Sequence, residues 1–267
     1  MSQQFYARAA KPGDEPLMLQ MEQAAWAGIA DDYTYTLEQF QDAVRVFPAG
    51  QILVIDSQSN ALAAMFNTVR IHYNPNDQLS WPIVSGDGWA SRSHNLNGEH
   101  LYGVNLGCHP FYRGRGAGRL AIETALKLTV QLELNAFYAA GRLPDYHRFN
   151  EIFSPEHYVH LRMSPEGLHL VTPNGETRNF DFRRVVDAIQ RGQRLHPYDG
   201  SGPTTAREAI GTILKYPPLD RGLRPWSRAR HLGRPLAVVG HIPNYMIDAE
   251  SLDNGALMYW QNPEKIE

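Results

Sequence analysis

A short segment rich in glycine and arginine is the part of the sequence best suited to hold a charged ligand. It runs, in order, Arg113, Gly114, Arg115, Gly116, Ala117 and Gly118. Backbone N–H groups at the start of a helix point towards one place and carry the positive end of the helix dipole, so they bind phosphate groups. Glycines let a phosphate approach the backbone closely, and arginines add charge-assisted hydrogen bonds. The segment predicts a phosphate-binding loop, although glycine-rich turns also precede helices that bind nothing.

Two nucleotide-binding motifs with similar glycine spacing do not fit this segment. A P-loop requires Gly-Lys followed by Ser or Thr, and the segment has no such sequence. A dinucleotide-binding fingerprint requires a further glycine where Arg119 stands, and it belongs near the start of a βαβ unit. The glycines therefore favour another kind of phosphate ligand.

A second group of residues that could do chemistry follows further along the chain. Imidazole as a chemical group titrates near neutral pH, so His147 could move protons. Tyr158 could act as an acid, and Arg162 could pair with a substrate carboxylate. Each has a structural alternative, namely a hydrogen-bonded turn histidine, a core aromatic ring and a solvent-facing helical arginine. His157 and His160 stand three residues apart on a predicted helix, but no third ligand is evident, so we assign no metal.

Hydrophobic periodicity and turn residues predict the elements that position these groups. Strands are expected at Phe5–Arg8, Gln51–Asp56, Ala61–His72, Leu101–His109, Asn135–Ala140, Leu236–Ile242 and Gly255–Trp260. Helices are expected at Asp14–Ile29, Thr36–Val46, Gly116–Leu132, Pro155–Met163, Asp181–Arg191 and Thr205–Leu214. The stretch Asn74–His100 is rich in Asn, Asp, Gly, Ser and Pro, which predicts a long surface connection.

Composition limits the classes of protein to which the chain can belong. The chain has 267 residues, a net charge of -3 and one cysteine, Cys108. This length can bury a substantial core without a disulfide, so we expect one compact unit. The charge gives no overall attraction to nucleic acid or anionic lipid. No signal-peptide pattern and no run of about 18 apolar residues occurs. We expect a cytoplasmic protein without nucleic-acid or membrane partners, and the oligomeric state stays open.

The stretch VNLGCHPFYRGRGAG, residues 104–118, resembles the acyl-CoA binding motif of the GNAT superfamily of N-acetyltransferases. That motif reads Arg or Gln, two residues, Gly, one residue, then Gly or Ala, and Arg113, Gly116 and Gly118 match it. The predicted order of elements is similar as well. The resemblance implies an α/β (α+β) fold, with a mixed, mostly antiparallel central sheet of about seven strands flanked by helices. It also implies a single domain, residues 1–267, with a large helical or irregular insertion at 141–235 before the last two strands.

The same resemblance implies coenzyme A, or acetyl-CoA as acyl donor, as the ligand of the loop. In the superfamily, the strand before the motif and the strand after its helix splay apart, and the pantetheine arm enters between them. By this analogy Leu106, Gly107 and Cys108 would pair backbone groups with pantetheine and polarise the thioester carbonyl. Residues 113–118 would bind the pyrophosphate. We interpret Cys108 itself as a small buried residue rather than a nucleophile.

Acyl transfer to an amine needs a base and an acid, and the superfamily often supplies a glutamate on the motif strand or a neighbour. This strand offers Asn105 and no carboxylate. The insertion resembles that of a GNAT subgroup, which includes domains fused to nitrilase-like hydrolases and polyketide synthase loading domains. In the loading domains a Trp, a Thr, a His and an Arg line the acyl pocket. Trp26, His147 and Arg162 are the matches here, while no residue matches the Thr and Trp26 could instead be core.

The resemblance to the GNAT superfamily implies three alternative functions. The first is transfer of an acetyl or other short acyl group from coenzyme A to a small-molecule acceptor, with Tyr158 as the acid towards the thiolate. The second is decarboxylation of a malonyl-CoA-type substrate and loading of an acyl carrier protein. The third is a non-catalytic CoA-binding module. We expect the first, because it is the most frequent activity of the superfamily.

Overall fold

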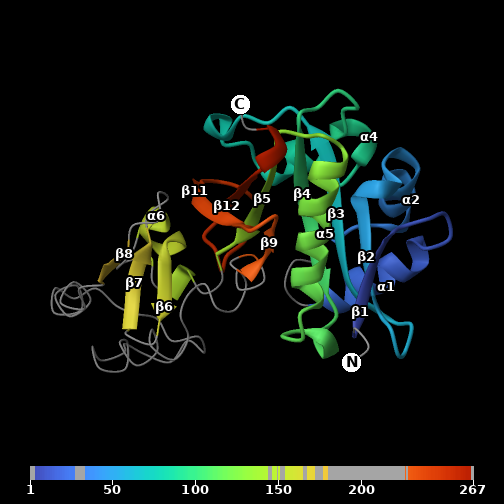
Figure 1. Cartoon of the computed structure of the whole chain (residues 1–267), viewed down its shortest axis with the longest axis horizontal. Coiled ribbons are helices and arrows are strands. Elements are labelled where there is room, and N and C mark those ends of the chain that lie inside the picture. The colour runs from blue at the N-terminus through green and yellow to red at the C-terminus, as the bar shows by residue number, and fades with distance from the viewer. Residues whose placement is uncertain are drawn as a thin grey trace. The chain divides into compact units, whose positions relative to one another are not determined.

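The computed structural model describes residues 4–27, 34–143, 146–148, 150, 154–164, 167–171, 177–179, 226 and 228–265. The chain divides into two compact units (Figure 1). The first comprises Met1–Ala140, Pro225–Leu236 and Tyr259–Glu267, and the second comprises Gly141–Arg224 and Ala237–Met258. The helices predicted at 181–191 and 205–214 lie outside the described residues.

The strands and α-helices of the described residues are labelled in chain order. The strands are β1 (Phe5–Ala9), β2 (Gln51–Asp56), β3 (Leu62–Ile71), β4 (His100–Cys108), β5 (Ala136–Arg142), β6 (Leu161–Ser164), β7 (Gly167–Val171), β8 (Thr177–Asn179), β9 (Arg230–His231), β10 (Arg234–Pro235), β11 (Ala237–Ile242) and β12 (Gly255–Gln261). The α-helices are α1 (Glu15–Trp26), α2 (Leu37–Val46), α3 (Trp81–Ser85), α4 (Ala90–Ser93), α5 (Ala117–Gln131) and α6 (Pro155–Val159). Short 3-10 helices are η2 (Pro48–Gly50), η3 (Pro75–Asp77), η4 (Pro110–Tyr112), η5 (Tyr146–Arg148) and η6 (Pro263–Lys265).

A seven-stranded sheet is the main feature of the fold, with the order β1-β2-β3-β4-β5-β12-β11. Strands β1 to β4 pair antiparallel with their neighbours, and β4 pairs parallel with β5. This confirms the predicted mixed, mostly antiparallel sheet. The short strands β9 and β10 form a separate hairpin.

Helices cover both faces of the sheet around β4. A Cβ atom added at Gly107 would lie 3.4 Å from the Ala25 Cβ, so this face of β4 meets α1. Neighbouring residues in a strand point to opposite faces, which directs Cys108 away from α1 and towards α5, where the Gly118 amide interacts with its thiol. Helix α5 packs on β1, β2, β3 and β4 through an apolar stripe that includes Ala121 and Ala125 (Figure 1). Strand β2 is buried at every position because it is covered from both sides.

The segment between β3 and β4 is more structured than its polar composition predicts. The expected surface connection at 74–100 contains η3, α3 and α4, so that prediction was wrong in part. Trp81 and Val84 are buried, and the Trp81 indole N–H donates to the Val104 carbonyl at 2.8 Å. A few apolar anchors thus fold a stretch that turn-forming residues otherwise dominate.

The helix predicted at 155–163 ends earlier than expected. Helix α6 stops at Val159, and Leu161 to Ser164 instead form β6, which pairs with β7 in the three-stranded sheet β6-β7-β8. Pairing with a neighbouring strand outweighed local helical preference here. The part of 141–235 that the structure describes therefore contributes strands as well as helices.

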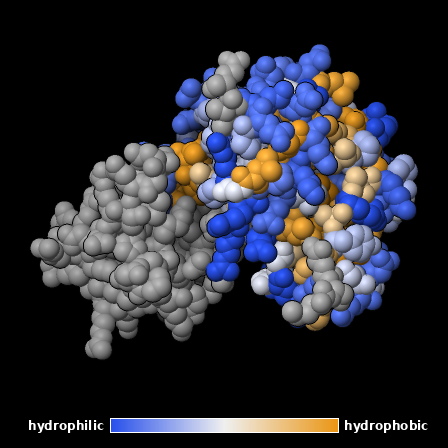
Figure 2. All heavy atoms as spheres, in the orientation of Figure 1, coloured by the Kyte–Doolittle hydropathy of each residue, from blue (hydrophilic) through white to orange (hydrophobic). Residues whose placement is uncertain are grey.

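Hydrophilic residues cover much of the described part of the face seen in Figure 2, with smaller hydrophobic groups between them. Within the described ranges, no helix combines the length and apolarity needed to cross a membrane.

We expect Trp81→Phe to destabilise the fold, because it keeps an aromatic ring but removes the donor to Val104. A buried carbonyl that loses its partner costs about 1–3 kcal/mol. The control is Trp89→Phe, since Trp89 is partly exposed and its indole N–H donates to none of the described residues. Urea unfolding of both variants measures the difference. Equal free energies of unfolding would contradict the importance of the Trp81 hydrogen bond.

Candidate functional site

Strands β4 and β5 part in the middle of the sheet. Their parallel register runs from His100 opposite Ala136 to Gly103 opposite Ala139, and β4 then continues to Cys108. Strand β3 stays paired with β4 along this whole length. The β3–β4 register shifts so that Val104 is an extra residue, and such a bulge bends a strand. Beyond Gly103, β4 pairs with β3 but no longer with β5, which opens an edge inside the sheet.

The open edge of β4 presents backbone groups of Leu106 and Cys108. The His109 N–H donates to the Ala63 carbonyl at 3.1 Å, so His109 faces β3. Backbone groups alternate along an antiparallel strand, and those of Leu106 and Cys108 therefore point away from β3. Both residues belong to the trio predicted to pair with pantetheine, and Gly107 lies between them.

The Cys108 thiol has the character of a half-buried structural side chain. Burial raises the pKa of this thiol above its ordinary value, although the charge of Arg113 and a hydrogen bond from the Gly118 amide act in the opposite direction. A raised pKa keeps the sulfur protonated at neutral pH, and only a thiolate is a strong nucleophile. These features favour the interpretation of Cys108 as a packing residue.

The loop before α5 has the backbone geometry of an open anion site. Gly114 and Gly116 have φ angles of +77° and +100°, in the left-handed region that favours glycine. A Cβ atom added at either glycine would meet nothing within 4 Å, so the space beside them is open. Among the described residues, the N–H groups of Gly114, Gly116, Ala117 and Arg119 donate to no acceptor.

Three arginines surround these amides, and all are exposed. Arg113 donates to the Ala25 carbonyl at 2.8 Å and to the Cys108 carbonyl at 3.3 Å, which ties the loop to the end of α1. These two contacts leave further guanidinium donors for a ligand. The Arg115 guanidinium lies 4.2 Å from the centre of the Phe111 ring, and Arg119 pairs with Glu123 at 3.7 Å. The loop is thus positively charged.

A buried carboxylate lies beside the open edge of β4, where the sequence predicted none. Glu22 and Trp26 stand four residues apart on α1 and so share one face of the helix. Asn105 donates through Nδ2 to Glu22 Oε2 at 2.8 Å, and the Trp26 indole N–H donates to Asn105 Oδ1 at 3.2 Å. The Tyr35 N–H donates to Glu22 Oε1 at 3.2 Å. Glu22 is only 1% exposed.

Burial raises the pKa of Glu22 to about 7, against the opposing hydrogen bonds from Asn105, Tyr35 and Trp26. The carboxyl therefore changes charge near neutral pH, a property common at functional sites. Sequence reasoning correctly found no carboxylate on β4, but it missed that α1 brings one to Asn105. The available signal was a single acidic residue between Met18, Met21 and Ala25 on the apolar face of α1.

The other predicted catalytic residues belong to the second unit, whereas Trp26 and the loop belong to the first. His147 lies on η5, half-buried, with its ring against the Glu250 carbonyl. Tyr158 on α6 is fully buried and packs against Tyr146 at 5.0 Å between ring centres. Arg162 lies on β6 opposite His169, rather than on the predicted helix. A role in the chemistry stays a prediction for all three.

In the described part of the chain, no three His, Cys, Asp or Glu side chains are arranged so that they could hold a metal ion.

Comparison with known proteins gives two similar sequences from Bacillus subtilis. No family model matches the chain. A stretch of 83 residues is 31% identical to part of the probable hydrolase YhcX, and it covers 31% of this chain but 16% of that protein. A longer match to the uncharacterized N-acetyltransferase YkwB has 22% identity over 227 residues, 84% of this chain and 74% of that protein.

Two solved structures share the fold over nearly the whole chain. The loading GNATL domain of CurA from Lyngbya majuscula has a TM-score of 0.58 and 14% identity, covering 96% of this chain and 97% of that chain. The GphF GNAT-like decarboxylase, in complex with isobutyryl-CoA, has a TM-score of 0.55 and 18% identity, covering 96% and 98%. The chain therefore has the GNAT fold, as its motif predicted.

The raised pKa of Glu22 makes a prediction about stability. A carboxyl whose pKa is near 7 in the folded chain and 4.5 unfolded binds a proton more tightly when folded. The proton on Glu22 therefore adds to the free energy of unfolding below a pH of about 4.5. This stabilisation, about 3 kcal/mol in total, is lost as the pH rises from about 4.5 to 7. We expect Glu22→Gln to remove this loss.

Urea unfolding of the wild type and Glu22→Gln at pH 5, 6, 7 and 8 tests the stability prediction. The variant should gain stability relative to the wild type as the pH rises. Glu99→Gln is the control, because the Glu99 side chain is 61% exposed, and it should leave the pH dependence unchanged. Parallel curves for the wild type and Glu22→Gln would rule out the raised pKa.

Proposed function

We propose that the chain is an acyl-CoA-dependent acyltransferase, which transfers an acetyl or other short acyl group to a small-molecule acceptor. The observation that carries this proposal is the set of open amides at Gly114, Gly116, Ala117 and Arg119, next to the free edge of β4. Amides at a helix start favour a diphosphate, and a free strand edge favours an extended chain with amide groups. Coenzyme A carries both chemical groups.

The residues present fit this ligand. The amides and Arg113, Arg115 and Arg119 would hold the pyrophosphate. Leu106 and Cys108 would pair with the amides of the pantetheine arm, and a backbone N–H there would polarise the thioester carbonyl. Acyl-CoA supplies the activated thioester, and the chain supplies position and proton transfer.

Asn105 is suited to orient the reacting groups beside this edge. Glu22 fixes its amide nitrogen and Trp26 fixes its amide oxygen, which sets the orientation of the whole group. An asparagine amide has two N–H donors and two acceptor positions, so one of each remains after the described contacts. In this proposal His147 takes the proton of the acceptor, and Tyr158 gives one to the departing thiolate.

A second function has its own support. The two solved structures compared above are GNAT-like domains, one described as a loading domain and the other as a decarboxylase. By analogy, this chain would decarboxylate a malonyl-CoA-type substrate and pass the acyl group to an acyl carrier protein. A non-catalytic CoA-binding module is the third outcome.

Two reactions followed by mass spectrometry and thiol release separate these functions. Acetyl-CoA with a library of amines should release free thiol under the proposed function. Malonyl-CoA should lose carbon dioxide only under the second function. Binding of CoA without either reaction would overturn both enzymatic functions and would indicate a non-catalytic CoA-binding module.

We expect Gly116→Leu to abolish CoA binding, because the side chain would occupy the space beside the open amides and would strain a backbone with a φ of +100°. Gly13→Leu is a matched control, since Gly13 has a φ of +99°, is exposed and also has nothing within 4 Å of an added Cβ. Isothermal titration calorimetry with CoA compares the two variants. Equal affinity for CoA in both would count against the loop as its binding site.

We expect His147→Ala to keep its affinity for CoA and to lose turnover. A positioned base contributes about 100-fold to 10,000-fold to the rate, and alanine cannot accept a proton. The same calorimetry measures the first quantity, and thiol release measures the second. Full activity in this variant would eliminate His147 as the proton shuttle.

A further inference from the structure

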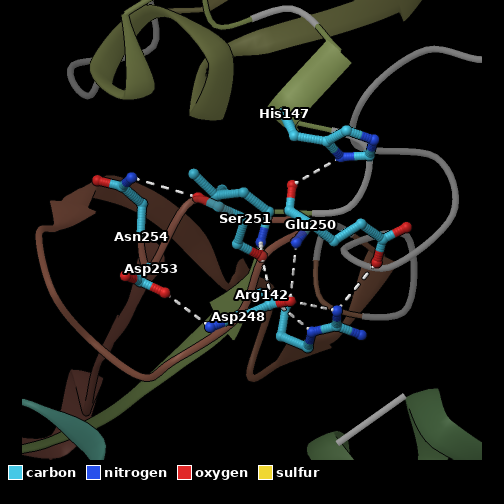
Figure 3. Close-up of polar contacts among 8 residues, drawn as sticks. Arg142, His147, Asp248, Glu250, Ser251, Asp253 and Asn254 are labelled. Carbon is cyan, nitrogen blue, oxygen red and sulfur yellow. Dashed lines mark hydrogen bonds and ion pairs between the residues drawn. The ribbon is translucent and has the colours of Figure 1, made fainter. Parts of the chain in front are cut away.

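In the second unit, an ion cluster of Arg142, Asp248 and Glu250 lies next to His147 (Figure 3). Arg142, at the end of β5, donates from Nε to Asp248 Oδ2 at 2.7 Å and from Nη2 to Asp248 Oδ1 at 2.6 Å. The same Nη2 donates to Glu250 Oε2 at 2.9 Å. The guanidinium of Arg142 thus bonds to two carboxylates. Its two parallel bonds to Asp248 fix the relative orientation of these two side chains.

Asp248 in turn fixes the turn that carries Glu250. The Glu250 N–H donates to Asp248 Oδ1 at 3.1 Å, and the Ser251 hydroxyl donates to Asp248 Oδ2. The Leu143 N–H donates to Ser251 Oγ at 2.8 Å, which joins the turn to the chain that leaves β5. The Asp248 side chain is only 6% exposed, so its bonds are shielded from water.

Arg142 and Asp248 both keep their charges at neutral pH. Burial would raise the pKa of Asp248, but hydrogen bonds from Arg142 and Ser251 and the charge of Arg142 outweigh it and lower that pKa. Burial opposes the charge of Arg142 as well, yet Asp248 and Glu250 raise the pKa of the guanidinium. The turn is thus held by a permanent ion pair.

The backbone carbonyl of Glu250 makes two polar contacts with His147. It accepts the His147 N–H at 2.9 Å and lies 3.2 Å from His147 Nδ1. A carbonyl oxygen can only accept a hydrogen bond, so Nδ1 must carry the ring proton in this contact. The neutral ring then has its lone pair on Nε2, the nitrogen on the other side of the ring.

We propose that Arg142, Asp248 and Glu250 are positioning residues that fix the tautomer of His147, so that Nε2 is the basic nitrogen. This inference rests on the role of His147 in the proposed function. In the transfer, the acceptor forms a bond to the acyl carbon while the C–S bond of the thioester breaks. The acceptor proton moves to Nε2, and the thiolate leaves with a proton from Tyr158. The bond from Nδ1 to the Glu250 carbonyl becomes charge-assisted in the imidazolium, which stabilises that state.

The ring nitrogens can be observed directly by NMR without knowledge of the acceptor. Long-range proton–nitrogen correlation spectra of protein labelled with nitrogen-15 histidine distinguish protonated from unprotonated ring nitrogens. The signals that disappear in His147→Gln belong to His147. At a pH where the ring is neutral, we expect a protonated Nδ1 and an unprotonated Nε2 in the wild type. A protonated Nε2 in the wild type would overturn the inference, whatever the protein catalyses.

Asp248→Asn tests the cluster, because it removes the negative charge opposite Arg142. We expect a mixture of tautomers, together with a kcat lowered by about tenfold in thiol release from acetyl-CoA with the amine library, and unchanged affinity for CoA. Asp253→Asn is the matched control, since its side chain can still accept the Asp248 N–H, and its tautomer and kcat should match the wild type.

Glu250→Gln is a milder second variant if Asp248→Asn does not fold. It removes one ion pair to Arg142 while the backbone carbonyl remains, and it should shift the tautomer in the same direction. A folded variant of either kind with wild-type His147 signals and wild-type kcat would overturn the inference. Full thiol release in His147→Ala would instead overturn the proposed role of His147, even if the NMR spectra show the expected tautomer.

Discussion

The parting of β4 from β5 after Gly103 is the constraint on which the candidate CoA site depends. A sheet normally satisfies both sides of an inner strand, but β4 keeps only β3 beyond this point in the described register. The bulge at Val104 bends the strand there, and the Trp81 indole satisfies the Val104 carbonyl. The strand can therefore present the backbone groups of Leu106 and the N–H of Cys108 inside the fold next to the start of α5, while the Cys108 carbonyl accepts a hydrogen bond from Arg113. Two strands paired along their whole length would not leave such groups available.

Buried polar contacts fix the side chains on both units. Burial of a polar or charged group costs free energy unless hydrogen bonds compensate, so such groups persist only in defined geometry. Glu22 holds Asn105 in the first unit, and Asp248 holds the turn at Glu250 in the second. The two carboxyls differ in electrostatics. Glu22 faces neutral donors and has a pKa raised to about 7, while Asp248 faces Arg142 and has a lowered pKa.

The sequence predicted what local patterns encode. The glycine-rich loop, the helix after it and the strands of the main sheet follow from turn chemistry and hydrophobic periodicity, and the GNAT fold is confirmed. Contacts between distant residues could not be predicted in this way. Glu22 lies 83 residues from Asn105, and Arg142 lies 106 residues from Asp248. Strand β6 was mistaken for helix because its partner strand, not its own sequence pattern, determines its structure. The roles of the site residues stay predictions.

In the proposed complex, the amides before and within the first turn of α5 bind the diphosphate of coenzyme A. Backbone amide NMR during titration with CoA observes these groups one by one. We expect saturable shifts at Gly114, Gly116, Ala117 and Arg119, which pantetheine without the nucleotide should not reproduce. Unchanged amide signals at these four residues, while CoA binds elsewhere on the chain, would contradict it.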